Sequence, residues 1–193
     1  MTDLFLIVIS AALVNNIVVD RMIGMDPALA FVRKMDVTRG LCLTMFILLP
    51  AVTSSAWLLD NWLLAPLHLE YLRLPVFVST ILVICWLLKL YLHHINYKLG
   101  TRISVFLPFA GINTTILGAM LLNGETAQTP LQALAFGLGS AAGFALILII
   151  VTAAAERLET TDVPTPFRGL PILLVTLALI SMAFMGFTGL IKI

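Results

Sequence analysis

Amide side chains lie inside stretches of this sequence that are otherwise apolar, and they are its first candidates for chemistry. Asn15 and Asn16 interrupt the first apolar run, and Asn113 interrupts the fourth. An amide removed from water is costly unless it is hydrogen-bonded, so each of these residues needs a partner. They either cap breaks in helices or line a path for an ion or a cofactor, and the sequence leaves both interpretations open.

Ionisable residues follow the first two amides. Asp20 and Arg21 stand near the end of the first apolar run, and Asp26 comes shortly after Gly24. Ionisable groups in a membrane span are functional candidates by default. Neighbours in sequence project from different sides of a helix, so we do not expect Asp20 and Arg21 to pair with each other. Arg21 can extend to the membrane surface, and Asp26, which precedes Pro27, can cap a following helix.

The elements that must position these residues are apolar and helical. The chain has 193 residues, of which 61% are hydrophobic and 11% charged. A helix needs about 20 predominantly apolar residues to cross the hydrocarbon core of a bilayer. We therefore predict an all-α integral membrane protein with six transmembrane helices, at Leu4–Ile23, Leu41–Leu59, Leu74–Leu92, Ile103–Leu122, Leu131–Ala155 and Leu170–Leu190.

The distribution of basic residues predicts the orientation of these helices. Lys and Arg gather in the connections after the first, third and fifth runs, at Arg33, Lys34, Arg39, Lys98, Arg102, Arg157 and Arg168. The other connections contain only Arg73, and Lys192 stands near the C-terminus. Short loops rich in Lys and Arg remain in the cytoplasm. Both termini are therefore expected on the outer side of the membrane.

The polar interruptions suggest an internal symmetry. The first and fourth runs hold the asparagines and are followed or interrupted by Gly and Pro, whereas the other runs are more uniformly apolar. These two runs begin halves of three runs each, at about 1–95 and 96–193, so the second half must enter the membrane from the opposite side. Broken helices in inverted halves point to a site near the membrane midplane. We predict one transmembrane domain over 1–193, an inverted three-plus-three repeat with broken first and fourth helices.

Other features of the sequence suggest structural roles. Gly139 and Gly143 are four residues apart in the fifth run, a spacing that allows close helix packing within the subunit or against a partner. Cys42 and Cys85 lie inside runs with no CxxC spacing and are interpreted as small buried hydrophobic residues. No motif of a soluble enzyme occurs, and nucleic acid is not an expected partner.

Short motifs along the whole chain resemble one family. They are Leu13-Val14-Asn15-Asn16, Tyr71-Leu72-Arg73, Phe106-Leu107-Pro108 with Asn113, Leu121-Leu122-Asn123, Glu156-Arg157-Leu158, Asp162-Val163-Pro164, Pro166-Phe167-Arg168-Gly169 and Ala183-Phe184-Met185-Gly186-Phe187. Together they closely resemble the NqrDE/RnfAE family, and within it the RnfA-type membrane subunits of bacterial Rnf electron-transport complexes. The Pro166–Gly169 unit and the length of the chain favour the Rnf side of the family.

The resemblance implies a fold, partners and cofactors. It implies six helices in an inverted repeat and a homologous, RnfE-like partner inserted in the opposite orientation, besides the other subunits B, C, D and G. In the family these two subunits hold a 2Fe-2S cluster at the midplane, each with one cysteine from its broken first helix and one from its broken fourth. Flavins and further iron–sulfur clusters belong to partner subunits. The complex couples electron transfer between ferredoxin and NAD to sodium or proton movement, and this subunit is not catalytic alone.

The sequence departs from the family at the expected metal ligands. Alignment of the flanking motifs places Asp26 at the first cysteine position and Thr114 at the second. Iron–sulfur clusters are held by thiolates, and carboxylate or hydroxyl oxygens are harder, poorer ligands. Three accounts follow: the cluster is absent, it persists with Asp26 and partner ligands, or the subunit keeps only its structural and ion-path roles.

A function from another class is the alternative. A small secondary transporter or ion carrier would use the same broken helices to bind its substrate or cation directly. The replacement of the family's cysteines favours this alternative, whereas the motif resemblance along the whole chain favours an electron-transport subunit.

Overall fold

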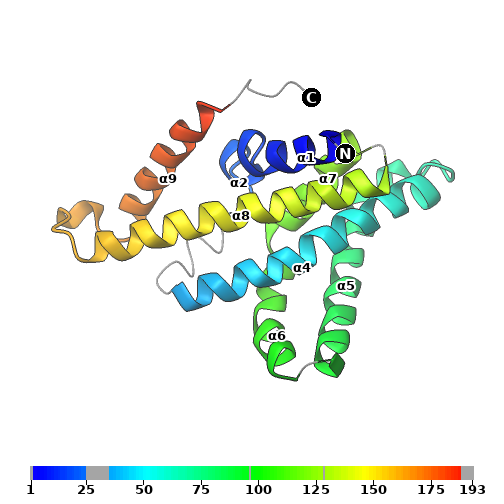
Figure 1. Cartoon of the computed structure of the whole chain (residues 1–193), viewed down its shortest axis with the longest axis horizontal. Coiled ribbons are helices and arrows are strands. Elements are labelled where there is room, and N and C mark those ends of the chain that lie inside the picture. Colours follow the sequence, from blue (N-terminus) through cyan, green and yellow to red (C-terminus); the bar gives the residue numbers. More distant parts are fainter. Residues whose placement is uncertain (1, 25–34, 96, 128, 188–193) are drawn as a thin grey trace.

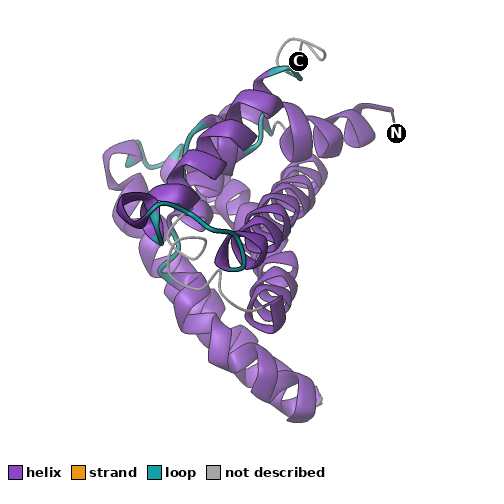
Figure 2. Ribbon diagram, turned by 90° about the vertical axis from the view of Figure 1, so that its left-hand side faces the viewer, coloured by secondary structure: helices purple, strands orange, loops and turns teal. Residues whose placement is uncertain are grey.

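The structure is a computed structural model that describes residues 2–24, 35–95, 97–127 and 129–187. Within these ranges the chain forms helices joined by loops and turns, with no strand (Figure 2). Asp26, one of the predicted site residues, lies outside the described residues. The predicted all-α fold is therefore confirmed for the part of the chain that is described.

The first half of the chain holds a broken helix and two long ones. Helix α1 (Thr2–Ile9) continues into the π-helical turn η1 (Ser10–Val14) and is followed by the short α2 (Ile17–Asp20). The long α4 (Met35–Leu59) continues into the π-helical turn η2 (Asp60–Leu64). The 3-10 turn η3 (Glu70–Leu72) then leads into α5 (Arg73–Ile95).

The second half has a similar order. Helices α6 (Tyr97–Gly111) and α7 (Thr114–Thr126) are followed by the long α8 (Pro130–Glu159), the 3-10 turn η4 (Thr165–Phe167) and α9 (Leu170–Met185). Figure 1 shows α5 and α6 side by side below α4, with α9 at the opposite end of the molecule.

Three helical stretches of the described chain are long and apolar enough to cross a membrane: Met35–Leu64, Glu70–His94 and Pro130–Glu159. The pair Ile103–Gly111 and Thr114–Gly124 makes a fourth candidate, bent by 62° at its break. The first and last apolar runs form shorter helices, over Leu4–Asp20 and Leu170–Met185. The six apolar runs are thus confirmed as helical, with breaks in the first and fourth, whereas six complete crossings and the inverted repeat stay predictions.

Helices α4 and α8 form the centre of the molecule and lie side by side (Figure 1). They bury large apolar side chains against each other and their neighbours, among them Met45, Leu48, Phe144 and Ile147. One polar contact joins the two helices in this core, a 2.8 Å hydrogen bond between the hydroxyl groups of Thr38 and Thr152. Thr152 also donates to the carbonyl of Leu148, so its hydroxyl is well satisfied in an apolar setting.

The glycines of α8 bring the broken first helix close to this centre. A side-chain carbon at Gly139 would lie 2.7 Å from the carbonyl oxygen of Val8, and one at Gly143 would lie 2.8 Å from that of Ala12. Neither position leaves room for a larger residue. The prediction of close packing through these glycines is confirmed, and the packing is within the subunit.

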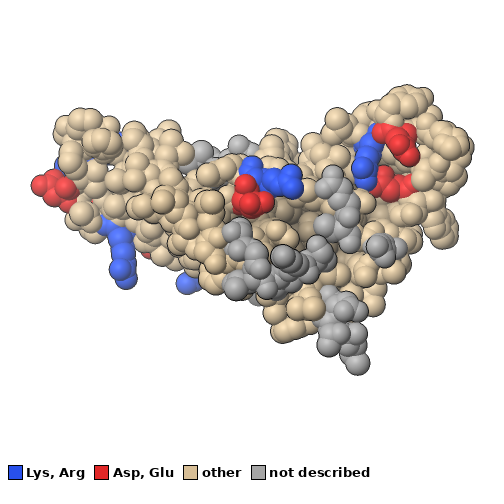
Figure 3. All heavy atoms as spheres, turned by 90° about the horizontal axis from the view of Figure 1, so that it is seen from above, with Lys and Arg blue, Asp and Glu red and all other residues tan. Residues whose placement is uncertain are grey.

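Charged side chains occupy a small part of the molecular face seen in Figure 3. Among the described residues on this face, Lys, Arg, Asp and Glu gather at a few places and the rest of the surface is uncharged. Helices α5 and α9 expose large apolar side chains such as Leu82, Trp86, Leu179 and Met182. Such faces suit contact with lipid or with an apolar partner.

Candidate functional site

Asn16 caps the helix that follows the first break. Its side-chain oxygen accepts a 3.0 Å hydrogen bond from the amide of Val18, and its backbone has the extended conformation of an N-cap. Its side-chain nitrogen donates to the carbonyl of Ala12 on the other side of the break, at 2.9 Å. One buried amide thus satisfies backbone groups that the break exposes on both sides, which is what an interrupted helix requires in an apolar medium.

Asn113 has the same role at the break of the fourth run. It is the N-cap of α7, and its side-chain oxygen accepts hydrogen bonds from the backbone amide and the hydroxyl of Thr115, each at 2.9 Å. Its side-chain nitrogen is buried and has no hydrogen-bond partner among the described residues. The two asparagines are therefore matched caps, and the one at the fourth run retains an unused donor.

Asn15 differs from its neighbour. Its side chain is exposed, and its nitrogen donates to the hydroxyl of Ser10 at 3.1 Å, within the π-helical turn. The three predicted asparagines therefore do not form one lining. Asn16 and Asn113 cap helix ends, whereas Asn15 lies at the surface of the first break.

The two breaks are joined through Gly24. The amide nitrogen of Gly24 donates a 2.9 Å hydrogen bond to the hydroxyl oxygen of Thr114. Gly24 has a φ of +85°, and a side-chain carbon there would collide with Thr115 and approach the side-chain oxygen of Asn113 to 3.0 Å. Gly24, just after the first apolar run, therefore packs against the first turn of α7. The helix breaks at Asn16 and Asn113 are linked by this contact.

A cavity of about 270 Å³ lies on the other side of the first break. It is bounded by α2, by the preceding turn and by α9, where the Ser181 hydroxyl donates to the carbonyl of Val19 at 3.3 Å. The lining residues are Leu13, Val14, Asn16, Val19, Asp20, Met22, Ser181, Phe184 and Met185. Asp20 and Asn16 give this otherwise apolar cavity its polar side chains, together with Ser181.

One sequence prediction about this region is wrong. Asp20 and Arg21 do form an ion pair, with 3.6 Å between the Arg21 Nε and the Asp20 carboxylate. The helix α2 ends at Asp20, and Arg21 is its C-cap, with a φ of −105°. The argument from opposite faces of a continuous helix therefore does not apply. Both side chains are about half exposed, at 56% and 46%, so the pair is a surface feature.

The donor set does not fit an iron–sulfur cluster. Thr114, which the motif resemblance predicts at a cysteine position of the family, offers a neutral hydroxyl that already accepts the Gly24 hydrogen bond. Cys85 lies beside the end of α6, where a side-chain carbon at Gly111 would be 3.0 Å from its sulfur, and Cys42 is buried in α4. Within the described ranges, no three His, Cys, Asp or Glu side chains are grouped to hold a metal.

Sequence reasoning missed two polar features. Asn123 is fully buried in α7, and its side-chain nitrogen donates to the carbonyl of Thr53 in α4 at 3.0 Å. Asp60 and Arg73 form an ion pair where α4 and α5 approach each other. An amide inside an apolar run could have identified Asn123 in advance, whereas no pattern in the sequence joins Asp60 to Arg73.

Comparisons with known proteins agree over the whole chain. The family model described as "Rnf-Nqr subunit, membrane protein" matches residues 4–191. Proteins named as the A component of an ion-translocating oxidoreductase complex, from Glaesserella parasuis, Shigella boydii and Escherichia coli O1:K1, are 38%, 37% and 36% identical to this chain. Each of these similarities covers 100% of both sequences. The chain therefore belongs to the Rnf-Nqr family of membrane subunits.

Proposed function

We propose that the chain is the A-type membrane component of an ion-translocating oxidoreductase complex of the Rnf type. The full-length similarity to proteins named as the A component of such complexes supports this role. The complex would couple electron transfer between ferredoxin and NAD to ion movement, with flavins and other iron–sulfur clusters on its remaining subunits, B, C, D and G among them. This chain is not catalytic alone.

The observation that carries the proposal is the matched pair of helix breaks. Asn16 and Asn113 cap α2 and α7 with the same hydrogen bond, from the amide two residues ahead to the side-chain oxygen. The breaks lie in the first and fourth apolar runs, which open the two predicted halves, and the Gly24–Thr114 hydrogen bond joins them. This arrangement supports an inverted repeat around a site near the membrane midplane, shared with an RnfE-like partner of opposite orientation.

The surroundings of Thr114 bear on whether this chain helps to hold a 2Fe-2S cluster. Thr114 supplies no thiolate, and its hydroxyl is engaged with Gly24. This favours the account in which the cluster is absent, and the account in which the subunit keeps only structural and ion-path roles, over the account in which Asp26 and partner ligands hold a 2Fe-2S cluster. The capped breaks would then serve to hold the helix ends in place at the interface with the partner.

The distribution of basic residues supports the proposed orientation, with both termini on the periplasmic side of the inner membrane. Single cysteines introduced at exposed loop positions, in a background that lacks Cys42 and Cys85, test it. Labelling by a membrane-impermeant maleimide at His68 and its absence at Thr160 in intact spheroplasts is the expected result, since both are exposed turn residues. The reverse pattern would overturn the orientation.

Purification of the complex tests the proposed role. A tagged version of this chain should recover an RnfE-like partner and the other subunits in fixed ratio. Recovery of the chain alone, together with a complex that assembles normally in its absence, would contradict the proposal.

A second experiment asks whether the site holds a 2Fe-2S cluster. It compares the iron content and the low-temperature EPR spectrum of the complex between wild type and the Asp26→Cys/Thr114→Cys double variant. An additional 2Fe-2S signal only in the double variant is expected, and an equal signal in both would show that other ligands hold a cluster.

The cavity beside Asn16 favours a second candidate, direct binding of a small substrate or cation by a carrier. Its lining combines Asn16, Asp20 and Ser181 with apolar side chains in about 270 Å³. Uptake of labelled sodium by proteoliposomes that contain only this chain separates the two functions. A redox subunit should transport nothing unaided, so uptake that is lost on Asp20→Asn would favour the carrier.

A further inference from the structure

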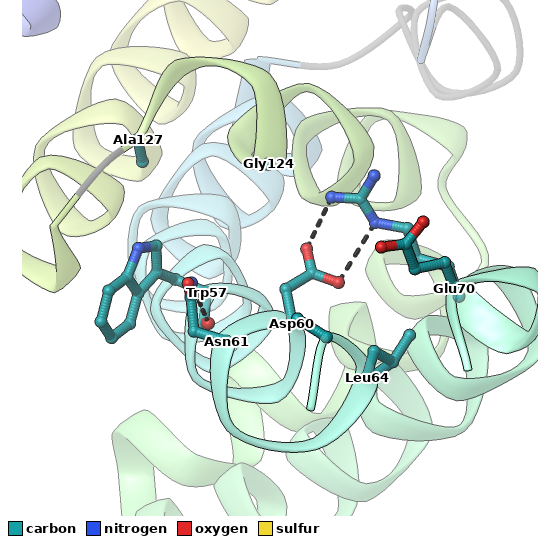
Figure 4. A pocket seen from close by; sticks show the side chains of 9 residues that line it. Trp57, Asp60, Asn61, Leu64, Glu70, Gly124 and Ala127 are labelled. Atoms are coloured by element: carbon teal, nitrogen blue, oxygen red, sulfur yellow. Dashed lines mark hydrogen bonds and ion pairs between the residues drawn. The ribbon is translucent and has the colours of Figure 1, made fainter. Parts of the chain in front are cut away.

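A second cavity, of about 550 Å³, lies at the end of the long helices and shares no lining residue with the helix breaks. It is formed where η2 ends α4, where α5 begins and where α7 ends. The residues that line it are Trp57, Asp60, Asn61, Leu64, Ala65, Glu70, Arg73, Gly124 and Ala127 (Figure 4). Several of them are charged or polar, which is uncommon in this apolar chain.

Arg73 is held in a fixed position in this cavity. Its Nη2 and Nε donate to the two oxygens of Asp60 at 2.6 and 3.2 Å, a two-pronged ion pair. Its guanidinium carbon also lies 5.5 Å from the centre of the Phe77 ring. Gly124 makes room for it, because a side-chain carbon there would collide with the guanidinium. The charge of Asp60 is therefore balanced by Arg73, and the pair forms one wall of the cavity.

Glu70 leaves this cavity with a negative charge in excess. Its exposed carboxylate lines the cavity and forms no hydrogen bond or ion pair with the described part of the chain. Figure 4 shows it on the same side as the Asp60 ion pair, with the Trp57 ring across the cavity. The side-chain nitrogen of Asn61 donates a 3.0 Å hydrogen bond to the carbonyl oxygen of Trp57. The side-chain oxygen of Asn61 therefore stays available as an acceptor. These unused acceptors suit a ligand that is positively charged and donates hydrogen bonds.

The position of the cavity indicates where such a ligand comes from. One apolar helical stretch ends at Leu64 and the next begins at Glu70, so the cavity lies where the chain leaves the apolar layer and turns back. Trp62 and Tyr71 flank this turn with 77% and 75% of their surfaces exposed, and Leu63, Leu67 and Leu74 are exposed beside them. Exposed Trp and Tyr are enriched at the level of the lipid headgroups.

We propose that this cavity binds the headgroup of an aminophospholipid of the phosphatidylethanolamine class. The primary ammonium would donate to Glu70 and to the side-chain oxygen of Asn61, and the phosphate would meet the guanidinium of Arg73. The exposed leucines at the rim would accompany the acyl chains. A phosphatidylcholine headgroup fits less well, because its quaternary ammonium has no N–H with which to satisfy these acceptors.

A photoreactive lipid tests the proposal on the intact, detergent-purified complex. The probe is phosphatidylethanolamine with a diazirine in one acyl chain, compared with phosphatidylcholine that carries the same chain. After irradiation, mass spectrometry measures the labelled fraction of the peptide that spans residues 57–74. We expect labelling by phosphatidylethanolamine to exceed that by phosphatidylcholine several-fold and to fall to the phosphatidylcholine level in Glu70→Gln.

Glu159→Gln is the matched control, because Glu159 is an exposed carboxylate at the end of α8 and outside this cavity. It should leave the labelling unchanged, and all three proteins should retain the same subunits on purification. Equal labelling by both lipids, or equal labelling of wild type and Glu70→Gln, would overturn the proposal. A carbodiimide cross-link between Glu70 and a lysine of another subunit in the complex would also overturn it, since a protein side chain would then occupy the cavity.

Discussion

Gly24 and Thr114 are 90 residues apart in the sequence and are joined by a 2.9 Å hydrogen bond from the backbone of one to the side chain of the other. Through this contact, Gly24, which follows the first broken run, packs against the first turn of α7. The contact also depends on glycine, because Gly24 combines a left-handed backbone with the absence of space for a side chain. The two breaks are therefore parts of one structural unit, and the stability of each should depend on the other.

Substitution of Gly24 by alanine should be strongly destabilising. The left-handed backbone alone costs an L-residue about 1–2 kcal/mol, and at Gly24 the added carbon also collides with Thr115. Gly169→Ala is the control, since Gly169 has the same φ of +85° but no atom within 4 Å of the added carbon. The thermal midpoint of the purified protein in detergent should fall clearly further for Gly24→Ala, and equal losses would show that the contact with α7 is unimportant.

Asn113→Ala, which removes the cap of α7, should lower the free energy of unfolding more than Asn15→Ala, which removes the amide beside the other cap. Asn113→Ala leaves the amide and hydroxyl of Thr115 without their shared acceptor, and the loss of such a cap costs about 1–2 kcal/mol. Asn15→Ala removes only the exposed bond to Ser10 and should change stability by less than about 0.5 kcal/mol. Chemical denaturation of both variants in mixed micelles measures the difference, and a neutral Asn113→Ala would contradict the capping role.

Removal of the two buried hydroxyls of Ser140 and Thr152, both on α8, should change the stability of the protein in different ways. Ser140 is buried with no hydrogen-bond partner for its oxygen among the described residues, so Ser140→Ala should be neutral or should stabilise the protein. Thr152→Val removes the bonds to Thr38 and Leu148 and should destabilise the protein by about 1–2 kcal/mol. The two thermal midpoints provide the comparison. A clear loss for Ser140→Ala would contradict the view that its hydroxyl contributes no hydrogen bond.

The Asp60–Arg73 pair should contribute measurably to stability, unlike the ion pairs at the surface. Asp60 and Arg73 have only 18% and 34% of their side chains exposed and meet at 2.6 Å. Arg73→Gln leaves a mostly buried carboxylate unpaired, and we expect a loss of about 1–2 kcal/mol after allowance for solvent screening. Arg39→Gln is the control, because its pair with Asp36 is 3.8 Å long and largely exposed. A double-mutant cycle with Asp60→Asn isolates the interaction, and a coupling near zero would contradict this role.

The apolar helices, and the places where two of them break, could be predicted from the sequence alone. Both depend on local composition: long apolar runs must form helices in a membrane because their backbone groups need internal partners, and Asn among them indicates a cap. Asn16 and Asn113 could therefore be identified in advance as candidate caps, although not distinguished from lining residues. The exposure of Asn15, the hydrogen bond between Gly24 and Thr114 and the ion pair between Asp60 and Arg73 became known only from the folded structure. These relationships depend on how distant helices pack, and packing is set by the shapes of many side chains at once, which no local pattern in the sequence records.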